Sequence, residues 1–242
     1  MCATSPRRES LFMRTILRFA LPVVAAAAAV VLTATSAQAA TWSSSDKFGS
    51  WSNGGYTISN DVWGGGAGPQ TIWANSYSNW GVSSNQPNTG GVKSYPHSGR
   101  AINRTLSSIG SVTSSFNVSV PGAGAYETAY DIWANNNAYE IMLWMNKTGA
   151  VGPIGSLQTT VSVGGHTWDV YKGSNGSNAV FSFLRHGNTS SGSVDIKAVL
   201  NWIKSKGWFG DVTLGDVQFG FEITSTGTSR SFTSNSFSVH SS

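Results

Sequence analysis

Apolar and polar residues alternate along most of the chain with a period of two. From about residue 40 onward, short alternating runs rich in β-branched and aromatic residues are interrupted every eight to twelve residues by Gly or Asn clusters. This pattern is typical of half-buried β-strands joined by turns. It predicts strands over residues 55–59, 71–75, 112–120, 125–133, 139–145, 158–163, 166–172, 179–184, 217–224 and 236–240.

One segment breaks this alternation and predicts a helix. Its apolar residues sit at helical spacing: Val194, Val199, Leu200 and Ile203. Ser193 is the expected N-cap and Gly207 lies just past the expected end, so the helix is predicted over 194–206, on the outside of one sheet. Many strands with a single helix predict an all-β fold, a two-sheet sandwich or jelly roll.

The N-terminal segment, residues 1–39, has the features of a secretory signal peptide. Two arginines precede an apolar run over residues 19–32, and Ala37-Gln38-Ala39 supplies the small-x-small pattern that signal peptidase cleaves. A second methionine, Met13, begins a compact signal by itself. Nothing later in the chain is apolar for long enough to span a membrane. The sequence therefore predicts a secreted, extracellular protein.

Removing this leader changes the charge of the protein. Residues 40–242 keep 11 basic and 10 acidic side chains, so the net charge falls from +4 to +1. A nearly neutral surface gives no electrostatic basis for binding nucleic acid or an anionic membrane, which makes a neutral polymer the expected partner. The single cysteine, Cys2, lies in the leader, so no disulfide is expected. No Pro/Thr-rich linker or change in composition divides residues 40–242, so they are predicted to form one domain. A monomer is the expected state for a secreted domain that degrades a polymer.

Glutamate is scarce in this domain, and each glutamate falls on a predicted strand. Strand alternation places Glu140 on one face with Met142 and Trp144. It also turns Glu222 away from the apolar face of its strand, beside Gly220, which leaves room for a ligand to approach. Glu140 thus projects from a face that also carries an aromatic side chain, and Glu222 projects from a face where a glycine leaves open space.

A third predicted strand presents two further carboxyl groups, Glu127 and Asp131, on one face with Trp133. Sugar hydrolysis needs one carboxyl group that protonates the departing oxygen and a second, ionised one that attacks or activates water. Aromatic rings provide flat platforms for sugar faces. The same spacing also fits ordinary surface carboxylates on a half-buried sheet, so alternation by itself leaves both interpretations open.

Two segments carry a resemblance to a known family. Glu140-Ile141-Met142-Leu143-Trp144 and Gly220-Phe221-Glu222 resemble the two catalytic-strand signatures of glycoside hydrolase family 12, the compact jelly-roll endoglucanases. Further matches occur in the family's order: Lys93-Ser94-Tyr95-Pro96, Tyr130-Asp131-Ile132-Trp133, Pro153-Ile154-Gly155, Val163-Gly164-Gly165-His166-Thr167-Trp168, Gly176-Ser177-Asn178 and Asn235-Ser236-Phe237. Together they span nearly all of residues 40–242.

The resemblance implies a two-sheet β-sandwich jelly roll with a concave substrate cleft. It also implies a secreted retaining endo-β-1,4-glucanase that hydrolyses internal bonds of cellulose-type β-glucans. By position, Glu140 would be the nucleophile, Glu222 the general acid/base and Asp131 a helper carboxylate beside the nucleophile. A retaining pair has its carboxyl groups about 5–5.5 Å apart. Trp63 and Phe48 would stack on glucosyl rings.

Some positions depart from the family pattern. Asp61 stands where the family often has Asn, and Glu127 occupies a position that is frequently uncharged; both are expected to affect cleft charge and pH optimum. Residues 63–86 match least clearly and lack the cysteines that some bacterial members pair. Asp61, Met142 and Trp144 complete the candidate substrate-binding residues.

Two alternative functions remain open at this stage. A xyloglucan-specific endo-β-1,4-glucanase would share the fold and mechanism, because loop changes that one sequence does not reveal decide whether side chains on the glucan are tolerated. A noncatalytic carbohydrate-binding module would explain the tryptophans without needing the two glutamates. The four histidines lack the short spacings of metal ligands, so neither a metal nor a cofactor is expected.

Overall fold

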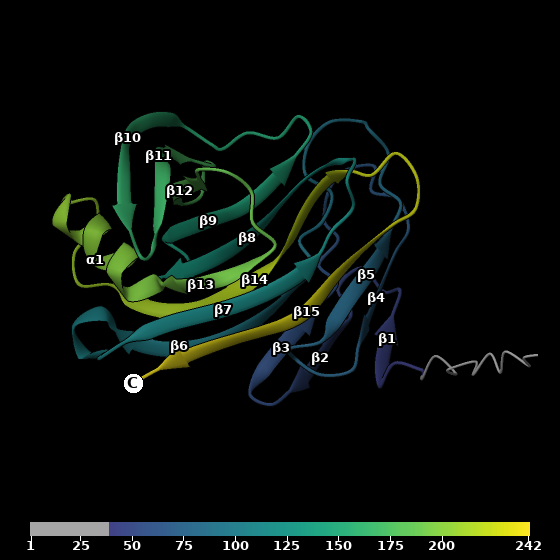
Figure 1. Ribbon diagram of the computed structural model, residues 1–242, viewed down its shortest axis with the longest axis horizontal. Coiled ribbons are helices and arrows are strands. Elements are labelled where there is room, and N and C mark those ends of the chain that lie inside the picture. The colour runs from purple at the N-terminus through teal and green to yellow at the C-terminus, as the bar shows by residue number, and fades with distance from the viewer. Residues whose placement is uncertain (1–38) are drawn as a thin grey trace, which may run out of the picture. The chain divides into compact units, whose positions relative to one another are not determined.

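The computed structural model describes residues 39–242, which fold into two β-sheets (Figure 1). In spatial order, the six-stranded sheet contains β1 (Trp42–Ser44), β4 (Gln70–Ala74), β5 (Trp80–Ser84), β15 (Arg230–Ser241), β7 (Val112–Ser119) and β13 (Ser191–Asp195). The nine-stranded sheet contains β10 (Ser156–Val163), β11 (His166–Ser174), β12 (Ala179–Arg185), β9 (Tyr139–Thr148), β8 (Ala125–Ala134), β14 (Thr213–Ser225), β6 (His97–Thr105), β3 (Tyr56–Ser59) and β2 (Ser50–Asn53). The predicted all-β, two-sheet architecture is confirmed.

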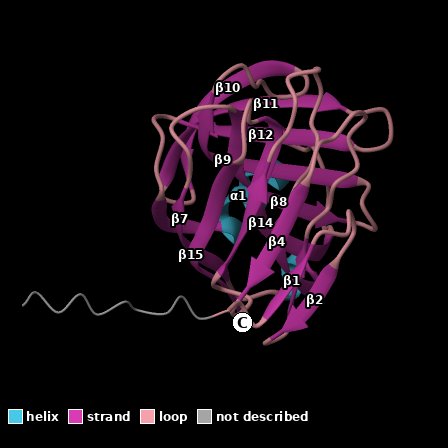
Figure 2. Ribbon diagram, turned by 90° about the vertical axis from the view of Figure 1, so that its right-hand side faces the viewer, coloured by secondary structure: helices cyan, strands magenta, loops and turns pink. Residues whose placement is uncertain are grey.

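The main core lies between the facing sides of the two sheets. Phe116 on β7 packs against Phe219 on β14 with ring centroids 4.9 Å apart, and Phe219 packs against Tyr130 on β8 at 4.8 Å. Along β7, buried and exposed residues alternate without interruption, as expected for a strand with one solvated face. Strands β8 and β9 are instead buried along most of their length on both faces. Side chains on the outer face of the nine-stranded sheet are therefore also largely buried along these central strands, which Figure 2 labels.

All ten predicted strands are present, and the structure adds five that alternation does not reveal. The added strands are β1, β2, β5, β6 and β13. β6 is rich in polar and charged residues, and its register is set by pairing with β14 and β3. Neighbouring strands pair antiparallel throughout except β9 and β12, which run parallel.

The predicted helix is present on the outside of the sandwich, but it begins later than expected. Helix α1 spans Ile196–Ser205, and the Asp195 carboxylate accepts a hydrogen bond from the Ala198 backbone N–H at 2.9 Å. Asp195 is therefore the N-cap, whereas Ser193 belongs to β13. Gly207, with φ +68°, follows the end of the helix as predicted. The helix contacts β7 of one sheet and β10 of the other, and its buried residues join the core: Ile196, Val199, Leu200 and Ile203.

Residues 39–242 cluster as one compact unit. The predicted signal peptide, residues 1–39, lies outside the described residues apart from its last position. Within residues 39–242, no helix has the length and apolar character needed to cross a membrane.

Candidate active site

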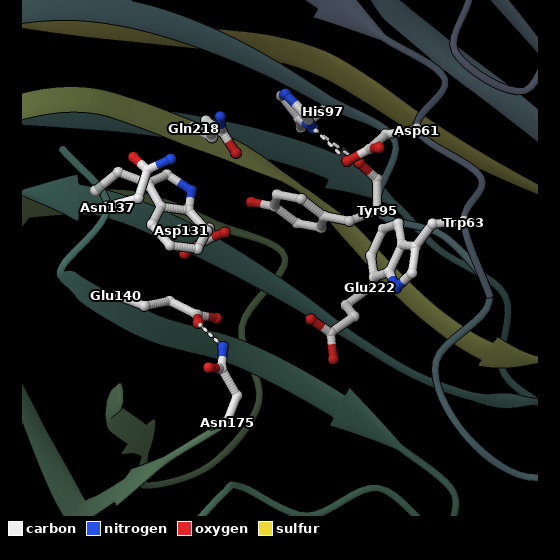
Figure 3. A pocket seen from close by; sticks show the side chains of 11 residues that line it. Asp61, Trp63, Tyr95, His97, Asp131, Asn137, Glu140, Asn175, Gln218 and Glu222 are labelled. Atoms are coloured by element: carbon white, nitrogen blue, oxygen red, sulfur yellow. Dashed lines mark hydrogen bonds and ion pairs between the residues drawn. The ribbon is translucent and has the colours of Figure 1, made fainter. Parts of the chain in front are cut away.

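A pocket of about 430 Å³ opens on the outer face of the nine-stranded sheet, at strands β8, β9 and β14 (Figure 3). Its lining combines carboxyl, amide and aromatic side chains: Asp61, Trp63, Tyr95, His97, Asp131, Trp133, Asn137, Glu140, Asn175, Gln218 and Glu222. The structure thus brings together five of the residues predicted from sequence: Glu140, Glu222, Asp131, Trp63 and Asp61.

Strand pairing explains how these carboxyl groups reach one pocket. β8 lies between β9 and β14, so Trp133 pairs with Glu140 on one side and Asp131 pairs with Gln218 on the other. Glu222 lies four residues beyond Gln218 on β14 and keeps the same face. The residues that alternate with them on these strands belong to the core. The predicted polar face is therefore the floor of the pocket.

Glu140 is held by two side-chain amides from the turn between β11 and β12. Its Oε2 atom accepts hydrogen bonds from Asn175 Nδ2 at 3.1 Å and Asn178 Nδ2 at 3.0 Å. Burial raises the pKa of Glu140, the Asn178 amide lowers it, and the nearby Glu222 raises it. The two amide donors stabilise the carboxylate form and fix its orientation. The net effect of these surroundings is a raised pKa of Glu140, whose carboxyl group is held in place by the two amides.

Asp131 is 7 % exposed and projects into the pocket from β8, the strand between those of Glu140 and Glu222 (Figure 3). Its Oδ1 atom has no hydrogen-bond partner within residues 39–242. Burial, and then the charges of Glu140 and Glu222, raise the pKa of Asp131 well above its ordinary value, while a hydrogen bond with Trp133 opposes this. A carboxyl group in these surroundings stays protonated at mildly acidic pH and has a proton to donate to an ionised neighbour.

Glu222 projects into the pocket from β14 and remains partly exposed. Burial raises its pKa, and a side-chain hydrogen bond from Glu127 opposes that rise. A raised pKa is what a general acid needs in order to carry a proton at the working pH. The pocket thus contains two carboxyl groups whose pKa burial raises, and two amide donors orient one of them, Glu140.

Comparison with known families agrees with this arrangement. Residues 54–241 match the model of glycosyl hydrolase family 12. The chain belongs to this family. It is therefore a glycoside hydrolase, which confirms the resemblance and the enzyme class predicted from sequence.

Relatives of this family 12 chain include solved structures and curated enzymes. The xyloglucanase domain of NopAA from Sinorhizobium fredii, solved with cellobiose, is 46 % identical, covers 84 % of this chain and 99 % of its own, and superposes with a TM-score of 0.81. A probable xyloglucan-specific endo-β-1,4-glucanase A of Aspergillus terreus is 32 % identical over 80 % of this chain and 85 % of its own length. Endoglucanase S of Pectobacterium parmentieri is 33 % identical over 71 % of this chain and 76 % of its own.

At one side of the family 12 pocket, Trp63 and Asp61 extend the carboxyl-lined floor. The Trp63 side chain is 49 % exposed, so its ring is available to a ligand. Asp61 has a positive φ of +41°, and its carboxylate lies 3.9 Å from His97 Nδ1. Burial raises the pKa of Asp61, and the charge of a protonated His97 opposes that rise.

Three predicted substrate-binding residues lie outside the family 12 pocket lining. Phe48 is 66 % exposed, and the C=O of the preceding residue, Lys47, accepts a hydrogen bond from the Val62 N–H at 2.8 Å. Met142 and Trp144 are buried, and they form a second apolar cluster with Ala129 and Val180. Alternation identified their face correctly, but apolar neighbours cover them. Their direct contact with substrate stays a prediction that this packing does not favour.

Sequence reasoning assigned no role to several residues that line the family 12 pocket or support it. Asn175 and Asn178 hold Glu140 although they lie on a turn, and the only sequence signal was the match at Gly176-Ser177-Asn178. Tyr95, from another matched motif, is 4 % exposed and donates its hydroxyl to the Ala129 carbonyl at 3.1 Å. Gln218 and Asn137 come from β14 and from the β8–β9 turn.

Within residues 39–242, no three His, Cys, Asp or Glu side chains are grouped so that they could hold a metal ion. The pocket histidine, His97, hydrogen-bonds the Tyr95 carbonyl through Nδ1 at 2.8 Å and stacks on the Tyr95 ring with centroids 5.0 Å apart. Burial lowers the pKa of His97. These contacts give His97 a structural role at the pocket wall.

Proposed function

We propose that this family 12 hydrolase is a retaining endo-β-1,4-glucanase in which Glu140 is the nucleophile and Glu222 the general acid/base. The observation that carries the proposal is that Glu140 and Glu222 project into one pocket from the same face of the sheet. Two amide donors orient the Glu140 carboxyl group, and burial raises the pKa of both glutamates. Double displacement on a glycoside requires two carboxyl groups in the same pocket, one as nucleophile and one as general acid/base.

In the first half-reaction, Glu222 transfers its proton to the glycosidic oxygen as that oxygen leaves the anomeric carbon. Glu140 attacks the same carbon and forms a covalent glycosyl ester. In the second half-reaction, the Glu222 carboxylate takes a proton from water while the water oxygen displaces Glu140, which restores both groups. A protonated Asp131 beside Glu140 donates a hydrogen bond that helps to disperse its charge when the ester breaks.

The proposed substrate is a β-1,4-linked glucan bound within its length. The pocket is rimmed by the exposed Trp63 ring, which suits a flat glucosyl face. Xyloglucan is the favoured member of this class, because the chain is 46 % identical to the NopAA xyloglucanase domain over 84 % of its length. Cellulose-type and mixed-linkage chains share the same backbone linkage and are the second candidates.

A substrate panel tests this proposal. Initial rates on xyloglucan, carboxymethylcellulose and mixed-linkage β-glucan are expected to be measurable, with kcat/KM highest on xyloglucan. Proton NMR of the first-formed product should show the β-anomer, because two successive inversions restore the starting configuration. An initial α-anomer would contradict the retaining mechanism, and absence of hydrolysis on all three would contradict the function. A higher kcat/KM on carboxymethylcellulose would contradict only the xyloglucan preference.

Trp63→Ala is expected to raise KM for the polysaccharide about tenfold while changing kcat little. The reason is that an exposed ring that stacks on a sugar contributes to binding, and about 1.4 kcal/mol corresponds to a factor of ten in affinity. Michaelis–Menten analysis checks this result. Leu157→Ala is the matched control, because Leu157 is a similarly exposed apolar residue on β10 outside the pocket lining. Equal KM changes in both variants would argue against a stacking role.

We also propose that the chain is exported through its N-terminal signal, residues 1–39, and that residues 40–242 act outside the cell as a monomeric catalytic domain. The apolar run over 19–32 and the Ala37-Gln38-Ala39 site support export. N-terminal sequencing of the protein from culture medium should begin at Ala40.

A further inference from the structure

Glu127 lies beside the acid/base residue, outside the pocket lining. It is on β8 and pairs directly with Glu222 on β14, and it shares the outer face of its strand with Asp131. The Glu127 side chain is 1 % exposed. Direct pairing on adjacent strands brings the two carboxyl groups within reach of each other. Two ionised carboxylates cannot hydrogen-bond each other, so a hydrogen bond between them requires that one of the pair carries a proton.

The surroundings indicate that this proton resides on Glu127. Burial raises the pKa of Glu127 well above its ordinary value, and the charge of Glu222 raises it further. Glu222 reaches the pocket and is partly exposed, so its ionised form is better solvated. The hydrogen bond accordingly lowers the pKa of Glu222 and raises that of Glu127. Glu127 is thus the donor and Glu222 the acceptor.

Other charged groups around the pair do not reverse this assignment. Lys147, which pairs with Glu127 from β9, favours an ionised Glu127, but its effect is the smallest of those acting on that carboxyl group. On the pocket side, the charge of Glu222 raises the pKa of both Asp131 and Glu140, after burial as the largest cause. The buried Tyr95 hydroxyl also interacts with Glu222. Glu127 therefore supplies a donor to a group that is otherwise surrounded by acids.

His97 and Asp61 complete the titratable groups on this side of the pocket. They interact mainly with each other, His97 Nδ1 lying 3.9 Å from Asp61 Oδ2. Asp216, from the other end of β14, interacts with Tyr95, His97 and Asp131. None of these groups separates Glu127 from Glu222, because the two residues occupy paired positions on adjacent strands.

We propose that Glu127 is a positioning residue for Glu222, a neutral carboxylic acid that donates a hydrogen bond to Glu222 and stabilises its ionised form. This inference rests on the acid/base role proposed above. When Glu222 gives its proton to the glycosidic oxygen, the resulting carboxylate accepts the Glu127 hydrogen bond, and Glu127 keeps its own proton. Glu222 is thereby held ready to take a proton from water in the second half-reaction.

The sign of the effect on the pH profile follows from this hydrogen bond. A donor that stabilises ionised Glu222 lowers the pKa of Glu222. The basic limb of the kcat/KM profile lies at the pH where Glu222 loses its proton and can no longer act as general acid, so the donor places this limb at lower pH. Removing the donor should move that limb to higher pH. An ionised Glu127 would have the opposite effect, because removing a like charge would move the limb to lower pH.

The experiment compares Glu127→Leu with Glu127→Gln in the full-length enzyme. Leucine fills the buried site without a donor, so the basic limb is expected to rise by about 1 pH unit, the shift that corresponds to losing one hydrogen bond to a charged group. Glutamine keeps a neutral N–H donor, so its limb should stay near that of the unmodified enzyme. A fall of the limb in both variants would overturn the proposal, and so would unchanged profiles in both.

A second measurement does not depend on turnover. The exported protein, residues 40–242, contains three glutamates, Glu127, Glu140 and Glu222, so labelling with ¹³C at the glutamate side-chain carboxyl carbon gives three signals to titrate. The Glu127 signal, assigned by its loss in Glu127→Gln, should remain protonated to higher pH than that of Glu222. The reverse order would overturn the proposal, even if Glu127→Leu failed to fold. If Glu222 proved dispensable for activity, the acid/base role would fail independently of this titration.

Discussion

Glu140→Ala is expected to lower kcat by about 10⁴-fold or more on every β-glucan, because the variant lacks the carboxylate proposed to form the covalent intermediate. The two amides that hold Glu140 would then face an empty space of carboxylate size. Azide should enter that space and restore turnover of an activated aryl β-cellobioside. Since azide performs a single displacement, NMR should show the product with inverted, α configuration.

The control for this experiment is Asp211→Asn. Asp211 is an exposed carboxylate that accepts a hydrogen bond from the Ser107 N–H at 3.0 Å and forms an ion pair with Lys204, and it does not line the pocket. That variant should retain the unmodified kcat. Activity close to the unmodified level in Glu140→Ala, or azide products of β configuration, would rule out Glu140 as the nucleophile.

Glu222→Ala should give a loss that depends on the leaving group. On polysaccharide the departing oxygen needs a proton, so kcat/KM is expected to fall by about 10²–10⁴-fold. With a dinitrophenyl glycoside the loss on the first step should be much smaller, because that group leaves without protonation. The basic limb of the pH profile should also disappear, since the group that titrates there is gone.

Two comparisons make the Glu222 result specific. In Glu140→Ala, kcat/KM should fall by a similar factor on substrates with good and with poor leaving groups. The ratio of the fall on polysaccharide to the fall on the dinitrophenyl glycoside therefore distinguishes the nucleophile from the acid. Azide added to Glu222→Ala should give a β-glycosyl azide, because it attacks a glycosyl intermediate that Glu140 has already formed. An equal loss on both substrates in Glu222→Ala would contradict its assignment as the acid.

The parts of the fold that follow from the sequence are those where burial repeats with the strand period. β7 alternates without interruption, and its predicted range, 112–120, nearly matches the observed one. β6 was missed because its sequence is polar and its place depends on pairing with β3 and β14. The start of α1 was misplaced because Asp195, and not Ser193, supplies the capping oxygen. Such choices depend on partners that lie far away in the chain.

The same limit applies to the site. Alternation showed that Glu140 and Glu222 project from polar faces, and the family resemblance gave them different roles. Neither revealed how deep each residue lies, so Trp144 was expected at the surface although it is 4 % exposed. Asn175 was missed because it contacts Glu140 from a turn 35 positions along the chain. The register that sets Glu127 opposite Glu222 is likewise visible only in the folded sheet.

The turn that holds Glu140 also affects how the enzyme ages. Asn175 Oδ1 accepts hydrogen bonds from the Ser177 and Asn178 N–H groups at 2.9 and 3.0 Å, so one side chain both closes the turn and holds the nucleophile. Asn175 precedes Gly176, and asparagine is among the thermolabile residues. Deamidation there would replace a donor by a carboxylate facing Glu140 and raise the pKa of the nucleophile. Deamidation of Asn175 is therefore expected to lower activity by removing a hydrogen bond from the nucleophile.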